Sequence, residues 1–215
     1  MSLLNGINQT LAASRLMIEG ALADPQLIKT LEAYGYNRKQ IQKGKAHLER
    51  AWLLFDNKEL SYQEKKRATQ QLTAYRTELR QVFLKHSGML RAFYRTDAAT
   101  QEELGLTQAT PQALDRFLTR AQRFYTKARL LQAATSDFPI ADEALMQAQA
   151  MIAAISDARI QQLSKKREAE RTTQQQNEAL KELRQWVRDF MAIAKIAFRE
   201  DPQQLEALGI VAKTA

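Results

Sequence analysis

Apolar residues recur along most of this chain at alternating intervals of three and four positions, with polar residues between them. This spacing places the apolar side chains on one face of an α-helix. The stripe after residue 180 also has the heptad-like spacing of antiparallel helical bundles. No segment shows the alternation at every second position that indicates a β-strand. The pattern therefore predicts an all-α protein, with these stripe residues: Ile41, Gly44, Leu48, Ala51 or Trp52, Phe55, Leu180, Leu183, Val187, Phe190, Ala194 and Ala197.

Capping and turn residues set the expected helix ends in the first half of the chain. Asp24-Pro25 is typical of a helix start and Gly35 of a helix end. The helix that carries the first apolar stripe is expected to end near residue 55, before a turn at 56–61. Ser61 and Glu64 have the spacing of a capping box, which predicts that a new helix begins there and extends to about residue 95.

The second half carries comparable signals. Thr110-Pro111 predicts the start of a continuous helix that ends near Ala134, and a further helix is expected from Ala141. Two short helices are also expected, each with an aspartate cap and a glycine end: Asp97 with Gly105, and Asp201 with Gly209.

The segment 164–178 departs from the apolar pattern, because Ala169 is its only apolar residue. A helix that is polar all round projects into solvent or bridges between parts of a protein. We therefore expect a hairpin tip that extends past the packed core. Helical residues at the end of this segment would project by roughly 20 Å, at about 1.5 Å per residue.

The two halves of the chain are related by a repeat. Residues 67–106 and 171–210, aligned without a gap at an offset of 104, share 13 identical residues in 40 positions. The same offset pairs Gly44 with the small residue Ala148. A duplication explains this agreement. We therefore expect a pseudo-symmetric helical bundle built from two repeats of antiparallel αα-hairpins plus short accessory helices, divided into residues 1–106 and 107–215 or packed as one continuous domain.

Composition and charge act mainly by exclusion. The 215 residues include no cysteine, which excludes disulfides and thiolate metal sites and fits a cytoplasmic protein. The N-terminus lacks the pattern of a signal peptide, and no apolar run is long enough to cross a membrane. The net charge of +8 divides into +5 for residues 1–106 and +3 for residues 107–215, so the basic excess is spread along the chain.

Candidate catalytic or metal-binding residues are sparse. Neither histidine has the Glu-x-x-His spacing of a diiron bundle, and His86 aligns with the apolar Phe190, which predicts an inward-pointing core position. Arg95-x-Asp97 and Arg199-x-Asp201 recur in both repeats and are interpreted as helix-end and cap residues. No nucleophile–base pair, glycine-rich phosphate loop or metal-ligand cluster appears. The sequence therefore predicts a protein that is not an enzyme and that binds no cofactor or metal.

Two basic clusters are the candidate partner-binding residues. They lie where the two hairpin tips are expected, and both precede glutamine-rich stretches. Cations of this kind clamp phosphates or dock acidic proteins, and they also occur on any solvated helix. Few aromatic residues accompany them, and no named nucleic-acid-binding motif does. The candidate residues are Lys65, Lys66, Arg67, Lys165, Lys166, Arg167 and Arg171.

Two turn patterns give the chain a resemblance to a known group of proteins. They are Ala21-Leu22-Ala23-Asp24-Pro25 with Tyr34-Gly35-Tyr36, and Ala197-Phe198-Arg199-Glu200-Asp201-Pro202 with Leu208-Gly209. With these patterns the chain resembles uncharacterised bacterial all-α proteins that have two tandem helical units. The resemblance covers most of the chain and implies the fold and a bacterial origin, without an activity or a functional residue.

Three functions stay open at this point. The first is a non-enzymatic interaction or scaffold protein that binds a protein partner or a second copy of itself. The alternative is a nucleic-acid-associated protein that uses the basic hairpin tips. The third is a bundle that holds an apolar ligand between its two units. A membrane partner is not expected, because the chain has no spanning segment.

Overall fold

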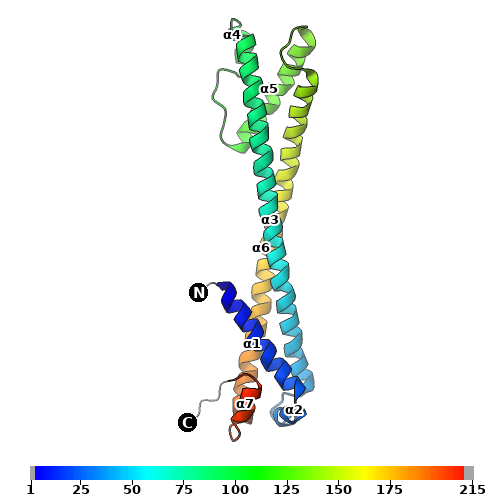
Figure 1. The fold of residues 1–215 in the computed structure, drawn as a ribbon, viewed down its shortest axis with the longest axis vertical. Coiled ribbons are helices and arrows are strands. Elements are labelled where there is room, and N and C mark those ends of the chain that lie inside the picture. Colours follow the sequence, from blue (N-terminus) through cyan, green and yellow to red (C-terminus); the bar gives the residue numbers. More distant parts are fainter. Residues whose placement is uncertain (1–2, 211–215) are drawn as a thin grey trace. The chain divides into compact units, whose positions relative to one another are not determined.

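A computed structural model describes residues 3–210 of the chain, with side chains from residue 6 onward. This part is helical and contains no strand, which confirms the all-α prediction (Figure 1). The helices are α1 (Leu3–Ala23), α2 (Pro25–Glu32), α3 (Arg38–Phe93), α4 (Ala98–Glu103), α5 (Leu114–Ala134), α6 (Asp142–Ala197) and α7 (Gln203–Ala207).

The chain forms two compact units. Unit 1 comprises residues 1–62 and 168–215, and unit 2 comprises residues 63–167. The long helices α3 and α6 have 56 residues each and contribute to both units. Each unit therefore combines segments from both sides of the boundary that the repeat predicts between residues 106 and 107.

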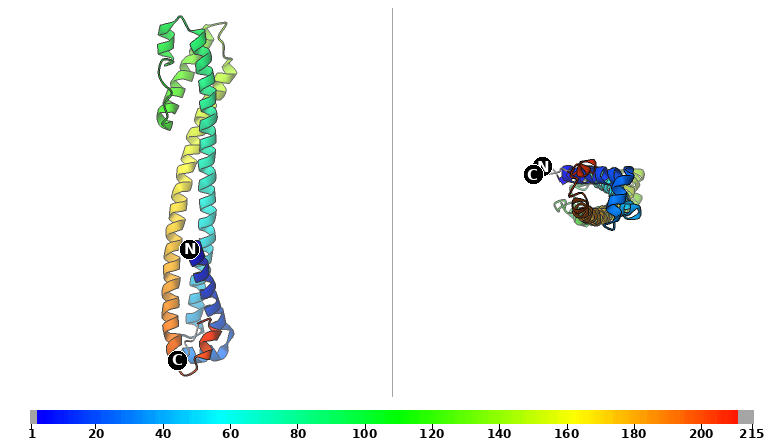
Figure 2. Two further views of the ribbon diagram at one scale, coloured as in Figure 1. Left: turned by 60° about the vertical axis from the view of Figure 1, so that its left-hand side comes forward. Right: turned by 90° about the horizontal axis from the view of Figure 1, so that it is seen from below.

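Unit 1 is built on the antiparallel pair of α3 and α6, with α1 lying against both helices (Figure 2). Across this pair, Arg50 of α3 donates to Glu182 of α6 at 2.7 Å. A small residue in α3 permits close contact with an aromatic ring of α6, because a Cβ on Gly44 would lie only 2.5 Å from Cε2 of Trp186. The Trp186 ring stacks on Phe190 with a centroid distance of 5.1 Å. The stripe residues Ile41, Leu48, Leu183, Phe190 and Ala194 are buried, as the periodicity predicts.

Unit 2 has a separate core in which α5 covers the α3–α6 pair. Phe83 of α3 lies at the centre of an aromatic cluster, with ring centroids 5.6 Å from Phe117 and 5.0 Å from Phe124, both on α5. At the edge of this core, Arg129 donates to both carboxylate oxygens of Asp142, at 2.7 and 3.1 Å. This ion pair lowers the pKa of Asp142 and raises that of Arg129.

Several predicted helix ends are confirmed. The side chain of Asp24 accepts the Gln26 amide at 2.8 Å and caps α2, and Gly35 follows with φ +87°. Asp97 caps α4 by accepting the Thr100 amide at 3.0 Å. The hydrogen bond from the Thr100 hydroxyl, together with this amide bond, lowers the pKa of Asp97. The glycine turns at Gly105 and Gly209 also have positive φ.

Two end predictions are wrong in detail. α7 takes Pro202 as its N-cap, and Asp201 accepts a hydrogen bond from the side chain of Gln204 rather than capping a backbone amide. α5 begins at Leu114 rather than at Pro111. Pro111 stays in the preceding loop, where its carbonyl oxygen accepts a hydrogen bond from Arg80 at 2.9 Å.

The predicted turn at 56–61 is wrong, because α3 continues through it without interruption. Residues 56–61 contain neither glycine nor proline, so nothing breaks the backbone hydrogen-bond ladder there. Ser61 is buried at 6% exposure and its hydroxyl donates to the Asn57 carbonyl at 2.8 Å. The serine thus acts as an interior residue that bonds one turn back, and no capping box forms.

The predicted hairpin tip at 164–178 is also wrong, because α6 is continuous through this segment. A pair of helices buries only a narrow strip on each partner, so few apolar residues are needed. Here Ala169 and Gln176 are buried, at 7% and 0% exposure. The hydroxyls of Thr172 and Thr173 bond to carbonyls four residues earlier, at 2.9 and 2.7 Å, which satisfies them within the helix. A helix that looks polar all round therefore still has a buried face.

Candidate functional site

The fold places the two basic clusters side by side in unit 2. Lys165 of α6 forms an ion pair with Glu64 of α3, with Nζ and Oε2 2.8 Å apart. Residues 65–67 and 165–167, which are 100 positions apart in sequence, therefore lie on adjacent turns of paired helices. Both clusters lie in helix interiors, so the predicted position at hairpin tips is wrong. The two clusters nevertheless lie close together.

Four of the candidate cations project from the surface. Lys66, Arg67, Lys166 and Arg167 are exposed, and no ion pair within residues 3–210 involves them. Lys65 and Lys165 are half-buried and engaged in interactions of their own. Arg171 is exposed but belongs to unit 1, so the seven predicted residues do not form a single site within one unit.

The basic excess of the chain is concentrated in unit 2. Its residues 63–167 include 17 basic and 10 acidic side chains, a net charge of +7. Unit 1 includes 15 basic and 14 acidic side chains, a net charge of +1. The two sequence halves carry +5 and +3, so this concentration emerges only when the residues are grouped by compact unit. A net charge of this size on one compact unit attracts anionic partners.

An apolar pair accompanies the cations on α6. Ile160 and Leu163 are exposed by 66% and 45%. With Arg167 they occupy positions i, i+3 and i+7, so the three side chains follow one face of the helix. We call Ile160, Leu163, Lys166 and Arg167 the α6 face. Exposed apolar residues with flanking cations at this spacing give α6 an amphipathic face of the kind that packs against another helix.

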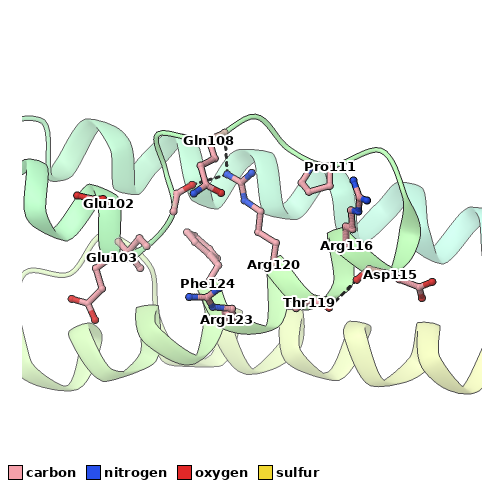
Figure 3. A pocket seen from close by; sticks show the side chains of 12 residues that line it. Glu102, Glu103, Gln108, Pro111, Asp115, Arg116, Thr119, Arg120, Arg123 and Phe124 are labelled. Atoms are coloured by element: carbon pink, nitrogen blue, oxygen red, sulfur yellow. Dashed lines mark hydrogen bonds between the residues drawn. The ribbon is translucent and has the colours of Figure 1, made fainter.

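A second feature of unit 2 was not predicted from the sequence: four arginines hold the loop between α4 and α5 by its carbonyl oxygens. Arg120 of α5 donates to the carbonyls of Gly105 and Gln108, both at 2.7 Å, and to that of Ala109 (Figure 3). The other three donors are at 2.6 to 2.9 Å: Arg76 bonds to Gln112, Arg80 to Pro111 and Arg91 to Leu106. No sequence pattern indicates these bonds, because the acceptors are backbone atoms.

Arg120, which makes three of the bonds to this loop, is partly buried and lies near the charge of Arg91. Burial lowers the pKa of Arg120, and the nearby charge of Arg91 lowers it further. Arg80 and Arg120 also lie over aromatic rings, 5.7 Å from the Phe117 centroid and 5.8 Å from the Phe83 centroid. Carbonyl acceptors carry no net charge, so these contacts fix the loop without neutralising the cations.

A pocket of about 410 Å³ opens beside this loop. The buried side chains of Phe124 and Leu104 lie at its base, and Arg116, Arg120 and Arg123 of α5 form part of its wall (Figure 3). The volume lies in the lower part of the range for small-molecule sites.

The histidines do not form a site. His86 is 7% exposed, as the alignment with Phe190 predicts, and its ring meets Tyr125 edge-on with centroids 5.8 Å apart. Burial lowers the pKa of His86, with a smaller contribution from Lys85. His47 lies in unit 1, where its Nδ1 is 3.5 Å from Glu182. Within residues 3–210, no three acidic or histidine side chains are grouped so that they could hold a metal ion.

Comparison of the chain with protein-family models, with curated proteins and with solved structures found no match. Across the described residues, no helix combines the length and the apolar character needed to cross a bilayer.

Proposed function

We propose that this chain is a non-enzymatic helical binding protein and that the α6 face of unit 2 docks an acidic amphipathic helix of a protein partner. The observation that carries the proposal is the exposed pair Ile160 and Leu163 next to Lys166 and Arg167. Apolar anchors contribute most of the binding energy at such a surface, and the cations select for acidic residues on the partner. The charge of +7 on unit 2 disfavours a second copy of the same unit as the partner.

The experiment is a quantitative pull-down of the tagged chain from a lysate with and without nuclease treatment, combined with cross-linking mass spectrometry. Two double variants test the two parts of the face: I160Q with L163Q removes the anchors, and K166Q with R167Q removes the charges. The matched control is L53Q with L60Q, because Leu53 and Leu60 of unit 1 are exposed to a similar extent, 62% and 60%.

The proposal expects a protein that cross-links to unit 2 through an acidic helix, that is lost in both unit 2 variants and that is retained in the control. Retention in both unit 2 variants would refute the α6 face as the docking site. Loss of the captured proteins on nuclease treatment would also refute it, in favour of nucleic acid.

A nucleic-acid-associated function is a second candidate, favoured by the charge of unit 2. Four exposed cations that each neutralise one DNA phosphate would make the affinity fall by about a hundredfold between 50 and 200 mM salt. Fluorescence anisotropy with a labelled DNA duplex measures this slope. The K166Q R167Q variant should flatten it, and I160Q L163Q should leave it unchanged. The second of these outcomes separates nucleic acid from a protein partner, which needs the apolar anchors.

We also propose that the chain arose by tandem duplication and forms a pseudo-symmetric pair of repeats. Two observations support this proposal. α6 begins and ends 104 residues after α3, which is the offset of the sequence repeat. At the same offset, the close pair Gly44–Trp186 of unit 1 corresponds to Ala148 and Val82, which both belong to the core region of unit 2. Alanine is larger than glycine and valine is smaller than tryptophan, so the two size changes compensate each other. A bacterial origin and a cytoplasmic location remain part of this proposal, the latter supported by the absence of cysteine.

A further inference from the structure

The pocket between α4, the following loop and α5 has two exposed arginines that no carboxylate neutralises. Arg116, Arg120 and Arg123 occupy positions i, i+4 and i+7 of α5, so they share one face of the helix. The two terminal nitrogens of Arg120 hold the loop, as described above, while its buried Nε has no hydrogen-bond partner. Arg116 and Arg123 are exposed, and no ion pair or hydrogen bond within residues 3–210 involves their guanidinium groups. Figure 3 shows them on either side of Arg120.

The acidic residues that line the pocket leave this positive charge largely in place. Glu103 pairs with Lys127 at 2.8 Å, and Asp115 pairs with Arg159 of α6. Glu102 is the one lining carboxylate without an ion pair among the described residues. With the two arginines against this single carboxylate, the mouth of the pocket favours an anion.

The rest of the lining favours an apolar or aromatic group. Pro111 is half-buried and presents its ring to the pocket, whereas Phe124 and Leu104, which are 1% and 3% exposed, close the pocket from the core side. The loop that forms the upper wall is held by hydrogen bonds: Arg120 donates to the carbonyl of Gly105, a glycine that adopts the positive φ of +67° without steric cost. A site with an apolar base, fixed walls and a few charged groups is the usual form of a small-molecule pocket.

We propose that this pocket binds a small anion that carries an aromatic or apolar group, with Arg116 and Arg123 both reaching its carboxylate or phosphate and the apolar group lying against Pro111. Arg116 and Arg123 are about 10 Å apart along the helix axis, a separation that two long arginine side chains can span to reach one anion. Guanidinium groups bind both carboxylates and phosphates through paired hydrogen bonds, and the assay therefore compares the two anions.

Isothermal titration calorimetry on the full chain tests the site with 1-naphthyl phosphate and 1-naphthoate as probes. Two comparison compounds separate the contributions: 1-naphthol lacks the anion, and inorganic phosphate lacks the rings. The proposal expects one of the two naphthyl anions to bind at least tenfold more tightly than both comparison compounds. Equal binding of inorganic phosphate would show a purely electrostatic contact and would overturn the proposal.

Three variants locate the binding. R116Q and R123Q should each weaken it by about tenfold, because each removes charged hydrogen bonds to the anion. T119W keeps every charge but fills the pocket from an exposed lining position, and it should abolish binding. The matched control is K66Q, which removes one exposed cation of unit 2 outside the pocket and should change the affinity less than twofold.

The control also keeps this site distinct from the proposed docking face. Equal losses in K66Q and R123Q, or full binding in T119W, would refute the pocket. Failure of I160Q L163Q to release a protein partner would refute the docking face and leave the pocket result unaffected. Circular dichroism confirms that each variant keeps its helical content before either comparison is made.

Discussion

The contact between Gly44 and Trp186 gives the sharpest test of how α3 and α6 pack in unit 1. Substitution of Gly44 by alanine has two opposing effects. Alanine is favoured over glycine inside a helix by about 1 kcal/mol. Its Cβ would lie 2.5 Å from Cε2 of Trp186, and overpacking of this kind costs about 1–3 kcal/mol. We therefore expect G44A to lower the free energy of unfolding by about 1 kcal/mol.

The matched control is Gly88, which lies in the same helix. A Cβ added at Gly88 meets no atom within 4 Å, so only the propensity gain applies. G88A is therefore expected to raise the free energy of unfolding by about 1 kcal/mol. Opposite signs for two glycine-to-alanine changes in one helix can arise only from their surroundings.

A double-mutant cycle extends the test to the proposed repeat. W186V removes the stacking on Phe190 and the edge contact with Tyr36 and should cost about 2–3 kcal/mol. Combined with G44A, it reproduces the Ala148 and Val82 pair of unit 2. Because the overlap disappears, the double variant should be about 2 kcal/mol more stable than the sum of the two single changes.

The assay is urea unfolding followed by circular dichroism and by tryptophan fluorescence. Trp52 and Trp186 both belong to unit 1, so the fluorescence reports on that unit. The double variant retains Trp52 as the reporter. A stabilisation by G44A as large as that by G88A would refute the packing of Gly44 against Trp186. Additive energies in the cycle would refute the size compensation and weaken the proposed symmetry.

Two further predictions concern unit 2. R120Q removes the charged donors to three loop carbonyls, and we expect it to lower the free energy of unfolding by about 2 kcal/mol. Hydrogen exchange of residues 105–113 should also become faster, and unchanged exchange would contradict the role of Arg120. Burial lowers the pKa of His86 below its unfolded value of about 6.5, so the folded state binds fewer protons and stability should fall as the pH drops below about 6.5. H86F, which copies Phe190, should lose less stability between pH 7.5 and pH 5 in urea unfolding, and an identical loss would show that His86 does not contribute.

The sequence by itself determined the helical class, the buried faces and several helix ends. These features depend on residues a few positions apart. Ile41, Leu48 and Leu183 share a face because of the period of the helix, and that face is buried. Asp24 and Asp97 cap helices because their side chains reach amides two or three residues ahead.

The predicted turns at 56–61 and in 164–178 were wrong for a reason that is also physical. A capping box is a local preference, and it competes with continuation of a helix that already has a partner to pack against. Ser61 and Ala169, both buried in unit 1, show that a two-helix contact can be made by small residues. A count of large apolar residues therefore underestimates how far such helices extend.

Only the tertiary structure decided where the charge lies and which cations lie together. The two sequence halves carry +5 and +3, whereas the two compact units carry +1 and +7, because α3 and α6 each contribute to both units. The pairing of residues 65–67 with residues 165–167 depends on the register of two long antiparallel helices. That register is set by contacts between the two helices, such as the fit of Trp186 against Gly44 and the ion pair of Arg50 with Glu182 in unit 1, and none of these contacts leaves a periodic signal in the sequence.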